Sequence, residues 1–289
     1  MAKRRLTMME AFDLRQALQV ATLDALLASR RWEPGHLVFQ GGTSLHLVHS
    51  SPRFSEDLDF LVDSALKLDS ISASMRARLE GTIWIPPDTA LTIGKAKDGR
   101  NPHAFVVSIG GPEVVGAVRV KVELWQTTAT VLSATKVVVA PVRLARGAMA
   151  GMQTFVPTAE LQEIYADKVF ALAARPYLKP RDVFDLHWLC THSGLRGCTE
   201  EALRARLATY PSETPGAWLR KALARREELM GAGATIAADL KRWLPSSWPL
   251  GEGSAKDMAR TAVEAMDQGI ILMREIDSSL REDYERPTP

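Results

Sequence analysis

The sequence predicts an α/β domain followed by a helical domain in a chain of 289 residues. Segments rich in β-branched residues, separated by Gly, Pro, Asn and Asp, occupy the first half. From Pro157 onward, apolar residues recur at helical spacing instead. The stretch from about 140 to 157 has weak periodicity and contains glycines and prolines, which favours a boundary there. We therefore expect domains at 1–150 and 151–289.

The α/β half should begin with a helix from about residue 8 to 30, where apolar side chains recur without Gly or Pro. The string "LVFQGGTSLHLVHS" predicts a short strand, a glycine turn and a helix, and "DLDFLV" predicts a strand that begins with two aspartates. Further strands are expected at "TIWI", "AFVVSI", "VRVKVELW" and "TKVVVAPV". Helices of the second half are expected at 159–175, 181–192, 199–208, 214–229, 234–243 and 255–283.

The amino-acid composition and net charge indicate what kind of protein this is. A chain with 46% hydrophobic and 24% charged residues is typical of a globular protein, and no apolar run is long enough to span a bilayer. The chain has 36 Lys and Arg against 34 Asp and Glu, a net charge of +2. This charge is too small for a protein whose whole surface binds nucleic acid, but it allows a local basic groove. The two cysteines give no disulfide framework, so we expect a cytoplasmic protein, and the charge balance favours a monomer.

Two aspartates separated by one residue are the first candidate for chemistry. Side chains alternate along a strand, so Asp57 and Asp59 should share one face, about 7 Å apart, with Leu58 and Phe60 on the other. Like charges so placed need a counter-ion, and Mg²⁺ is the usual one because it takes carboxylate and phosphate oxygens together. The alternative is a solvated strand edge.

The glycines ahead of this pair favour a phosphate site. Gly41 and Gly42 permit close approach of the backbone, and Thr43 or Ser44 then opens a helix whose free N–H groups suit a phosphate. A phosphate site followed 15 residues later by a metal site is what transfer of a nucleotidyl or phosphoryl group requires.

A third carboxylate is available on "VRVKVELW". Strand alternation places Arg119, Lys121 and Glu123 on one face, so Glu123 is a candidate metal ligand, and the two cations are candidate contacts of a triphosphate. The alternative is a half-exposed strand that carries an ordinary charge pair.

Lys168 interrupts an apolar stripe of the helix expected at 159–175, so its ammonium must either snorkel to solvent or meet an anion such as a nucleotide phosphate. The next helix places Asp182 and Asp185 close together, with Arg181 four residues before Asp185. An Arg181–Asp185 surface pair would need no functional explanation, and spacing alone leaves both possibilities open.

At this point the residues resemble a known family. The strings "GGTSLHLVHSSPRFSEDLDF", "ADKVFALAAR" and "KPRDVFDL" look like the AbiEii-type nucleotidyltransferase toxins of type IV toxin–antitoxin systems, within the polymerase-β-like nucleotidyltransferase superfamily. The resemblance runs from about Leu37 to Leu189. It implies a mixed-sheet catalytic domain, a helical domain that contributes to the active-site cleft, Mg²⁺-dependent transfer from an NTP, and a cognate antitoxin. It also implies the 3′ end of tRNA as acceptor, so that translation is blocked during phage defence.

The resemblance also implies roles for particular residues. Asp57 and Asp59 would bind the metal, and Lys168 would contact nucleotide phosphate. Either Asp182 or Asp185 would complete the site from the helical domain. The superfamily's third carboxylate is usually an aspartate, whereas this chain offers Glu123. The positions expected to bind the nucleotide are Gly41, Gly42, Thr43, Ser44, Arg53, Ser55, Lys121 and Lys168.

Ser55 carries a further hypothesis, because a phosphate or nucleotide attached there would place negative charge beside the metal ligands and silence the enzyme. Mass spectrometry of the toxin isolated with its antitoxin tests this, and a stably unmodified yet inactive Ser55 would count against it. Two other functions stay open at this point. One is nucleotidylation of a protein or small molecule, and the other is a non-catalytic binding module that regulates a partner.

Overall fold

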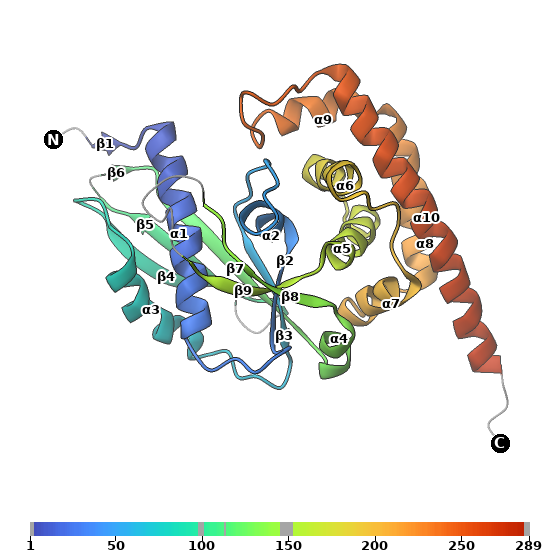
Figure 1. The fold of residues 1–289 in the computed structure, drawn as a ribbon, viewed down its shortest axis with the longest axis horizontal. Helices are drawn as coiled ribbons and strands as arrows, with labels where there is room; N and C mark the ends of the chain where they lie inside the picture. Colours follow the sequence, from blue (N-terminus) through green and yellow to red (C-terminus); the bar gives the residue numbers. More distant parts are fainter. Residues whose placement is uncertain (1–2, 98–100, 113, 145–152, 286–289) are drawn as a thin grey trace. The chain divides into compact units, whose positions relative to one another are not determined.

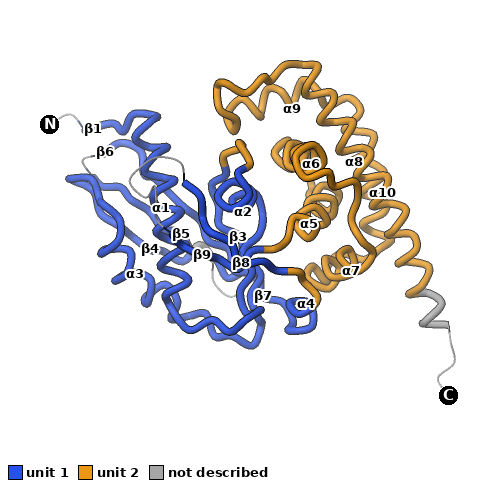
Figure 2. Tube along the Cα trace, in the orientation of Figure 1, with its two compact units in different colours: residues 1–50, 55–133, 137–158 blue, residues 51–54, 134–136, 159–289 orange. Residues whose placement is uncertain are grey.

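The protein is described here from a computed structural model that covers residues 3–97, 101–112, 114–144 and 153–285 (Figure 1). The chain divides into two compact units (Figure 2). Unit 1 comprises 1–50, 55–133 and 137–158, and unit 2 comprises 51–54, 134–136 and 159–289. The domain boundary expected at 150/151 lies outside the described residues.

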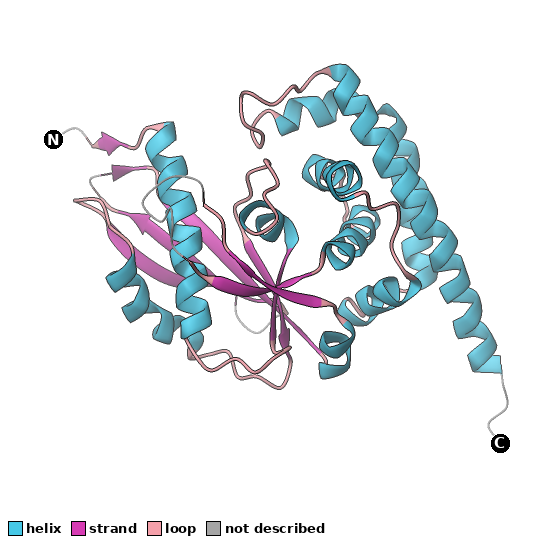
Figure 3. Ribbon diagram, viewed as in Figure 1, coloured by secondary structure: helices cyan, strands magenta, loops and turns pink. Residues whose placement is uncertain are grey.

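Unit 1 contains a seven-stranded mixed sheet in the order β4-β5-β7-β3-β2-β9-β8 (Figure 3). The antiparallel pairs include β4–β5, β5–β7 and β2–β3, whereas β3–β7 and β2–β9 are parallel. A separate parallel pair joins β1 to β6. The strands are β1 Arg4–Arg5, β2 Leu37–Gln40, β3 Leu58–Asp63, β4 Ala90–Lys97, β5 His103–Gly110, β6 Val114–Val115, β7 Val118–Thr127, β8 Val137–Pro141 and β9 Phe155–Ala159.

Among the described residues, four helices accompany this sheet and six lie in unit 2. The first four are α1 Met8–Ala28, α2 Gly41–Leu47, α3 Ile71–Thr82 and α4 Ala129–Ala134. The helices of unit 2 are α5 Leu161–Ala174, α6 Pro180–Ser193, α7 Glu200–Thr209, α8 Pro215–Gly231, α9 Gly233–Leu240 and α10 Glu252–Glu285. Among the described residues, no helix is both long enough and apolar enough to cross a bilayer.

The core of unit 1 lies between one face of the sheet and helices α1 and α3. Alternation along β7 buries Val118, Val120 and Val122 on this face, and each such side chain contributes about 1.5–3 kcal/mol on burial. Phe39 of β2 stacks on Phe60 of β3 with ring centroids 5.0 Å apart. The opposite face of the sheet is left for the polar residues described below.

Unit 2 is a helical bundle around α5. Trp218 of α8 is fully buried, and its indole N–H donates to the carbonyl of Phe170 at 3.0 Å. Gly269 of α10 lies against this pair of helices, since a Cβ there would stand 2.7 Å from Val169 Cγ1. The absence of a side chain at Gly269 therefore lets α10 pack closely on the bundle.

The structure confirms the expected mixed sheet followed by helices. It also contains elements that the sequence did not predict, among them α3, β4, α4 and β9. Two of the expected strands differ from the prediction. The strand expected at "TIWI" is wrong, because Thr82 ends α3 and residues 83–85 form no strand. Ile71, Met75 and Leu79 recur every four residues and are all buried, so the helical period decides this segment. The expected strand at "DLDFLV" begins at Leu58, which leaves Asp57 just ahead of it.

Candidate active site

The polar residues of unit 1 meet on the sheet face opposite α1 and α3. Asp59 of β3 is paired in register with Gln40 of β2 on one side and with Glu123 of β7 on the other. Paired residues point to the same face, and neighbouring strands lie about 4.8 Å apart. The register therefore brings Gln40, Asp59 and Glu123 side by side, with Asp57 one residue ahead of β3.

Lys121 supplies a cation to this group. Its ammonium forms an ion pair with Glu123, two residues along the same strand face. Partial burial alone would lower the pKa of Lys121, but its bond to Glu123 and the charges of Asp57 and Asp59 raise it. Three carboxylates thus act on one ammonium on this face of unit 1.

Gly41 lets Asp59 sit where it does. Its φ of +78° lies in the left-handed region, and a Cβ there would stand 2.7 Å from Asp59 Oδ2. A side chain at residue 41 would therefore strain the backbone and push the Asp59 carboxylate away. The glycine turn, which the sequence assigns to phosphate binding, makes room for the carboxylate in this structure.

The two hydroxyls after the glycines have partners within unit 1. Thr43 Oγ1 donates to the carbonyl oxygen of Asp57, and Ser44 Oγ lies 2.6 Å from Thr158 Oγ1 in a fully buried pair. Both bonds hold α2 against neighbouring elements of unit 1. The predicted contact of these hydroxyls with a triphosphate stays a prediction.

Two glutamines belong to the site although sequence reasoning missed them. Gln40 is 4% exposed, and its Oε1 has no hydrogen-bond partner among the described residues. Gln19 of α1 donates from Nε2 to the carbonyls of Ser55 and Glu56, at 2.8 and 3.1 Å, and so fixes the segment that leads into Asp57. Only the strand register reveals that Gln40 lies beside Asp59.

The donor set suits a hard divalent cation. Within the described ranges, no three His, Cys, Asp or Glu side chains are arranged as a formed metal site. The available atoms are nevertheless carboxylate and carboxamide oxygens, the ligands that Mg²⁺ takes, and one of them is a buried oxygen without a partner. The residues at this face therefore fit the metal that the sequence predicts.

A second ionic cluster lies wholly within unit 2. Arg53 forms two hydrogen bonds to Asp185, at 2.6 and 2.8 Å, and Lys168 lies 2.8 Å from Asp182 and 2.9 Å from Asp185. Arg175 adds an ion pair to Asp182 at 3.1 Å. Apart from Arg175, these side chains are all at least 90% buried.

The charges of this cluster stabilise one another. Burial alone would raise the pKa values of Asp182 and Asp185, but the adjacent cations outweigh it and hold both pKa values below their ordinary range. Burial alone would lower the pKa of Lys168, and the two aspartates raise it instead. Two buried cations thus balance two buried carboxylates.

This arrangement answers several expectations from the sequence. Lys168 meets anions rather than snorkelling, but the anions are the protein's own carboxylates. The possibility of an Arg181–Asp185 surface pair is wrong, because Asp185 is fully buried against Arg53 and Lys168. The guanidinium of Arg181 lies instead over the ring of Trp243, 4.0 Å from its centroid. Contacts of Arg53 and Lys168 with a nucleotide stay predictions, since both cations are bound to internal partners here.

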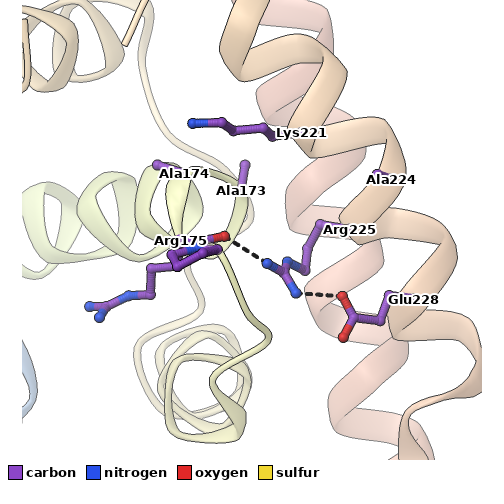
Figure 4. Close-up of a pocket in the computed structure, with 8 residues that line it drawn as sticks. Ala173, Ala174, Arg175, Lys221, Ala224, Arg225 and Glu228 are labelled. Atoms are coloured by element: carbon purple, nitrogen blue, oxygen red, sulfur yellow. Dashed lines mark hydrogen bonds and ion pairs between the residues drawn. The ribbon is translucent and has the colours of Figure 1, made fainter. Parts of the chain in front are cut away.

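A pocket of about 460 Å³ lies in unit 2 between the end of α5 and α8 (Figure 4). Arg225 crosses it and donates to the carbonyls of Leu172 and Arg175, at 3.0 and 2.7 Å, so it satisfies the carboxyl end of α5. The other charged side chains of the lining also form ion pairs. The polar groups of this pocket therefore connect helices of unit 2 to one another. Its lining is Ala173, Ala174, Arg175, Pro176, Lys221, Ala224, Arg225 and Glu228.

Comparisons with known proteins agree with this architecture. The family model described as "Nucleotidyl transferase AbiEii toxin, Type IV TA system" matches residues 24–284. MenT4, a nucleotidyltransferase toxin of Mycobacterium tuberculosis, has a similar structure, with a TM-score of 0.54 and 16% identity over 94% of this chain and 87% of that one. JHP933 from Helicobacter pylori aligns with a TM-score of 0.43 and 19% identity, over 92% of this chain and 96% of that one.

No protein with a curated description matches the chain. The likeness to MenT4 supports the fold alone, whereas the family model spans nearly the whole sequence and includes the glycine turn, the paired aspartates and the lysine helix. The chain belongs to the AbiEii family of nucleotidyltransferase toxins from type IV toxin–antitoxin systems, and it is a nucleotidyltransferase.

Proposed function

We propose that this toxin transfers a nucleotidyl group from an NTP to the 3′ end of tRNA, with Mg²⁺ held by Asp57, Asp59 and Glu123. The observation that carries the proposal is the convergence of these carboxylates on one sheet face, beside the unpartnered oxygen of Gln40. Together with the ammonium of Lys121, these three carboxylates form a group of oxygen ligands of the kind that a divalent cation takes.

The reaction then needs little from protein side chains beyond placement. The acceptor hydroxyl oxygen forms a bond to the α-phosphorus, the bond from that phosphorus to the bridging oxygen breaks, and pyrophosphate leaves. Mg²⁺ at these carboxylates would supply charge neutralisation and a lowered pKa for the hydroxyl, whose proton passes to solvent. Gln19 and Gly41 keep Asp57 and Asp59 in position for this step.

The biological consequence follows from the acceptor. A tRNA whose 3′ end carries additional nucleotides cannot be aminoacylated or used normally, so growth stops until the cognate antitoxin counteracts the toxin. We place this activity in the cytoplasm, where tRNA and NTP are available. Phage defence is the setting in which such an arrest would benefit a bacterial population.

The test is a transfer assay with purified protein, Mg²⁺, total tRNA and each α-labelled NTP in turn. Label should appear on tRNA with the wild type and disappear with Asp57→Ala and Asp59→Asn. Asp69→Asn is the matched control, since Asp69 is an exposed aspartate of the same unit that lies outside the site. Label on a protein or small molecule would replace the proposed acceptor, and no label on any acceptor would contradict the proposed reaction.

A further inference from the structure

The sheet face that bears Asp59 and Glu123 continues without interruption toward the β4 edge. In register, Arg119 and Lys121 of β7 lie beside Ser108 and Val106 of β5. Those two residues lie in turn beside Thr92 and Gly94 of β4. We call this set the open-face strip: Thr92, Gly94, Val106, Ser108, Arg119 and Lys121.

The open-face strip is accessible, in contrast to the other face of the same strands. Thr92, Gly94 and Arg119 are exposed, and Val106 and Ser108 are half-buried. A Cβ added at Gly94 would meet no atom of the described residues within 4 Å, so the space above the strand is open there. The opposite face is closed by α1 and α3.

Arg119 is the distinctive charge of the strip. Among the residues that the structure describes, its guanidinium forms no hydrogen bond or ion pair, whereas Lys121 next along the face is paired with Glu123. Strand geometry places Arg119 about 13 Å from Glu123 on the same face. A free guanidinium at that distance from the site would lie beyond the reacting hydroxyl, along the acceptor that carries it.

We propose that the open-face strip binds the sugar–phosphate backbone of the acceptor RNA, with Arg119 on a phosphate, so that its terminal hydroxyl reaches Asp59 and Glu123. Apart from its two cations the strip has small side chains, and none of its residues is aromatic, so it suits a backbone rather than stacked bases. Its cations complement phosphate, and it is continuous with the metal face. This inference rests on the proposed function and identifies where its substrate docks.

Binding of fluorescently labelled total tRNA, measured by anisotropy in EDTA over a range of KCl concentrations, tests the inference without turnover. Arg119→Ala should weaken binding several-fold and reduce the slope of log affinity against log salt by about 0.7, the loss of one phosphate contact to a single strand. Gly94→Glu should weaken binding and Gly94→Lys should strengthen it, because a new side chain there enters open space above the strand.

Arg76→Ala is the matched control, since Arg76 is an exposed arginine on α3, which covers the other face of the sheet. It should bind tRNA as the wild type does. A raised KM for NTP with wild-type tRNA affinity in Arg119→Ala would assign Arg119 to the triphosphate, as the sequence suggests, and would overturn the inference. If the Arg119 and Gly94 variants bind tRNA with the affinity of the wild type, while the wild type labels tRNA normally, the inference is overturned and the proposed function stays intact. Labelling of a protein instead of tRNA by the wild type would overturn both.

Discussion

Each unit carries two neighbouring aspartates and a lysine, but the two sets meet opposite surroundings. Asp182 and Asp185 are completely buried, and Lys168 and Arg53 neutralise them at hydrogen-bond distance. Asp57 and Asp59 are half-buried on a sheet face and share one ammonium with a third carboxylate. Similar residue patterns therefore give a fully buried ionic cluster in unit 2 and a half-buried one on a sheet face in unit 1.

The difference teaches that the burial of the carboxylates separates a structural charge cluster from a candidate site for an external cation. Removing a buried carboxylate leaves its cation without compensation in a medium of low polarity, which destabilises the fold. Removing a half-buried carboxylate that lies beside other carboxylates relieves repulsion instead. Substitutions in the two sets should accordingly separate stability from metal binding.

The largest expected effect on stability is that of Asp185→Asn. It removes the carboxylate that Arg53 binds and leaves Lys168 with Asp182 alone, so the free energy of unfolding should fall by about 3–5 kcal/mol in denaturant titrations. Asp267→Asn is the control, because its pair with Arg226 in the same unit is solvent-exposed and should contribute little to stability. Equal losses in the two variants would show that burial does not set the difference.

The pH dependence of stability should follow the same cluster. Asp182 and Asp185 have folded pKa values below their unfolded ones, so their contribution is complete above about pH 4 and is lost as pH falls through the folded values. Lys168 has a raised pKa, so its contribution is complete below about pH 10 and is lost as pH rises through the folded value. Thermal unfolding from pH 2 to 7 should show an acid loss that Asp185→Asn reduces.

A smaller stability effect is expected from Gly41→Ala, at about 1–2 kcal/mol for a left-handed residue. Gly35→Ala provides a matched control, because Gly35 also has a positive φ but a Cβ there meets no described atom within 4 Å. Both variants should lose similar stability, and only Gly41→Ala should lose nucleotidyl transfer as well, since its Cβ displaces Asp59. Full activity in Gly41→Ala would mean that the position of the Asp59 carboxylate is unimportant.

The smallest stability effect is expected from Asp59→Asn, within about 0.5 kcal/mol of the wild type, because the Asp59 carboxylate is half-buried and lies beside other carboxylates, whereas Asp185 is fully buried against two cations. Transfer should nevertheless be abolished. Chemical denaturation and the tRNA-labelling assay on the same preparation measure both quantities. A loss of stability comparable with that of Asp185→Asn would contradict the distinction between the two clusters.

The sequence predicted much of this organisation, and its failures have physical causes. Alternation and helical spacing located β7 and the helices of unit 2 correctly. The strand predicted at "TIWI" is wrong, because the prediction gave more weight to the β-branched residues than to the four-residue spacing of Ile71, Met75 and Leu79, which extends α3 to Thr82. The region of β9, which joins the sheet in parallel beside β2, was taken for part of a boundary because its pairing is not local in sequence.

The candidate site was predictable to the extent that its residues are close in sequence. Asp57 and Asp59 stand out by spacing, and Glu123 follows from strand parity. Gln40 was missed because only the register with Asp59 gives it meaning. The partners of Lys168 could not be predicted either. The spacing within one helix indicates that this lysine is buried, but it does not indicate that Arg53, over a hundred residues earlier, binds the same aspartate, Asp185.

The central claim is that the carboxylates of unit 1 hold the metal. The most direct test is the binding of Mn²⁺, a paramagnetic substitute for Mg²⁺, in the absence of NTP and acceptor. Water proton relaxation measures this binding. Asp59→Asn should lose most of the affinity, while Asp69→Asn binds as the wild type does and all three proteins unfold at similar temperatures. Wild-type Mn²⁺ affinity in a folded Asp59→Asn protein would contradict the claim.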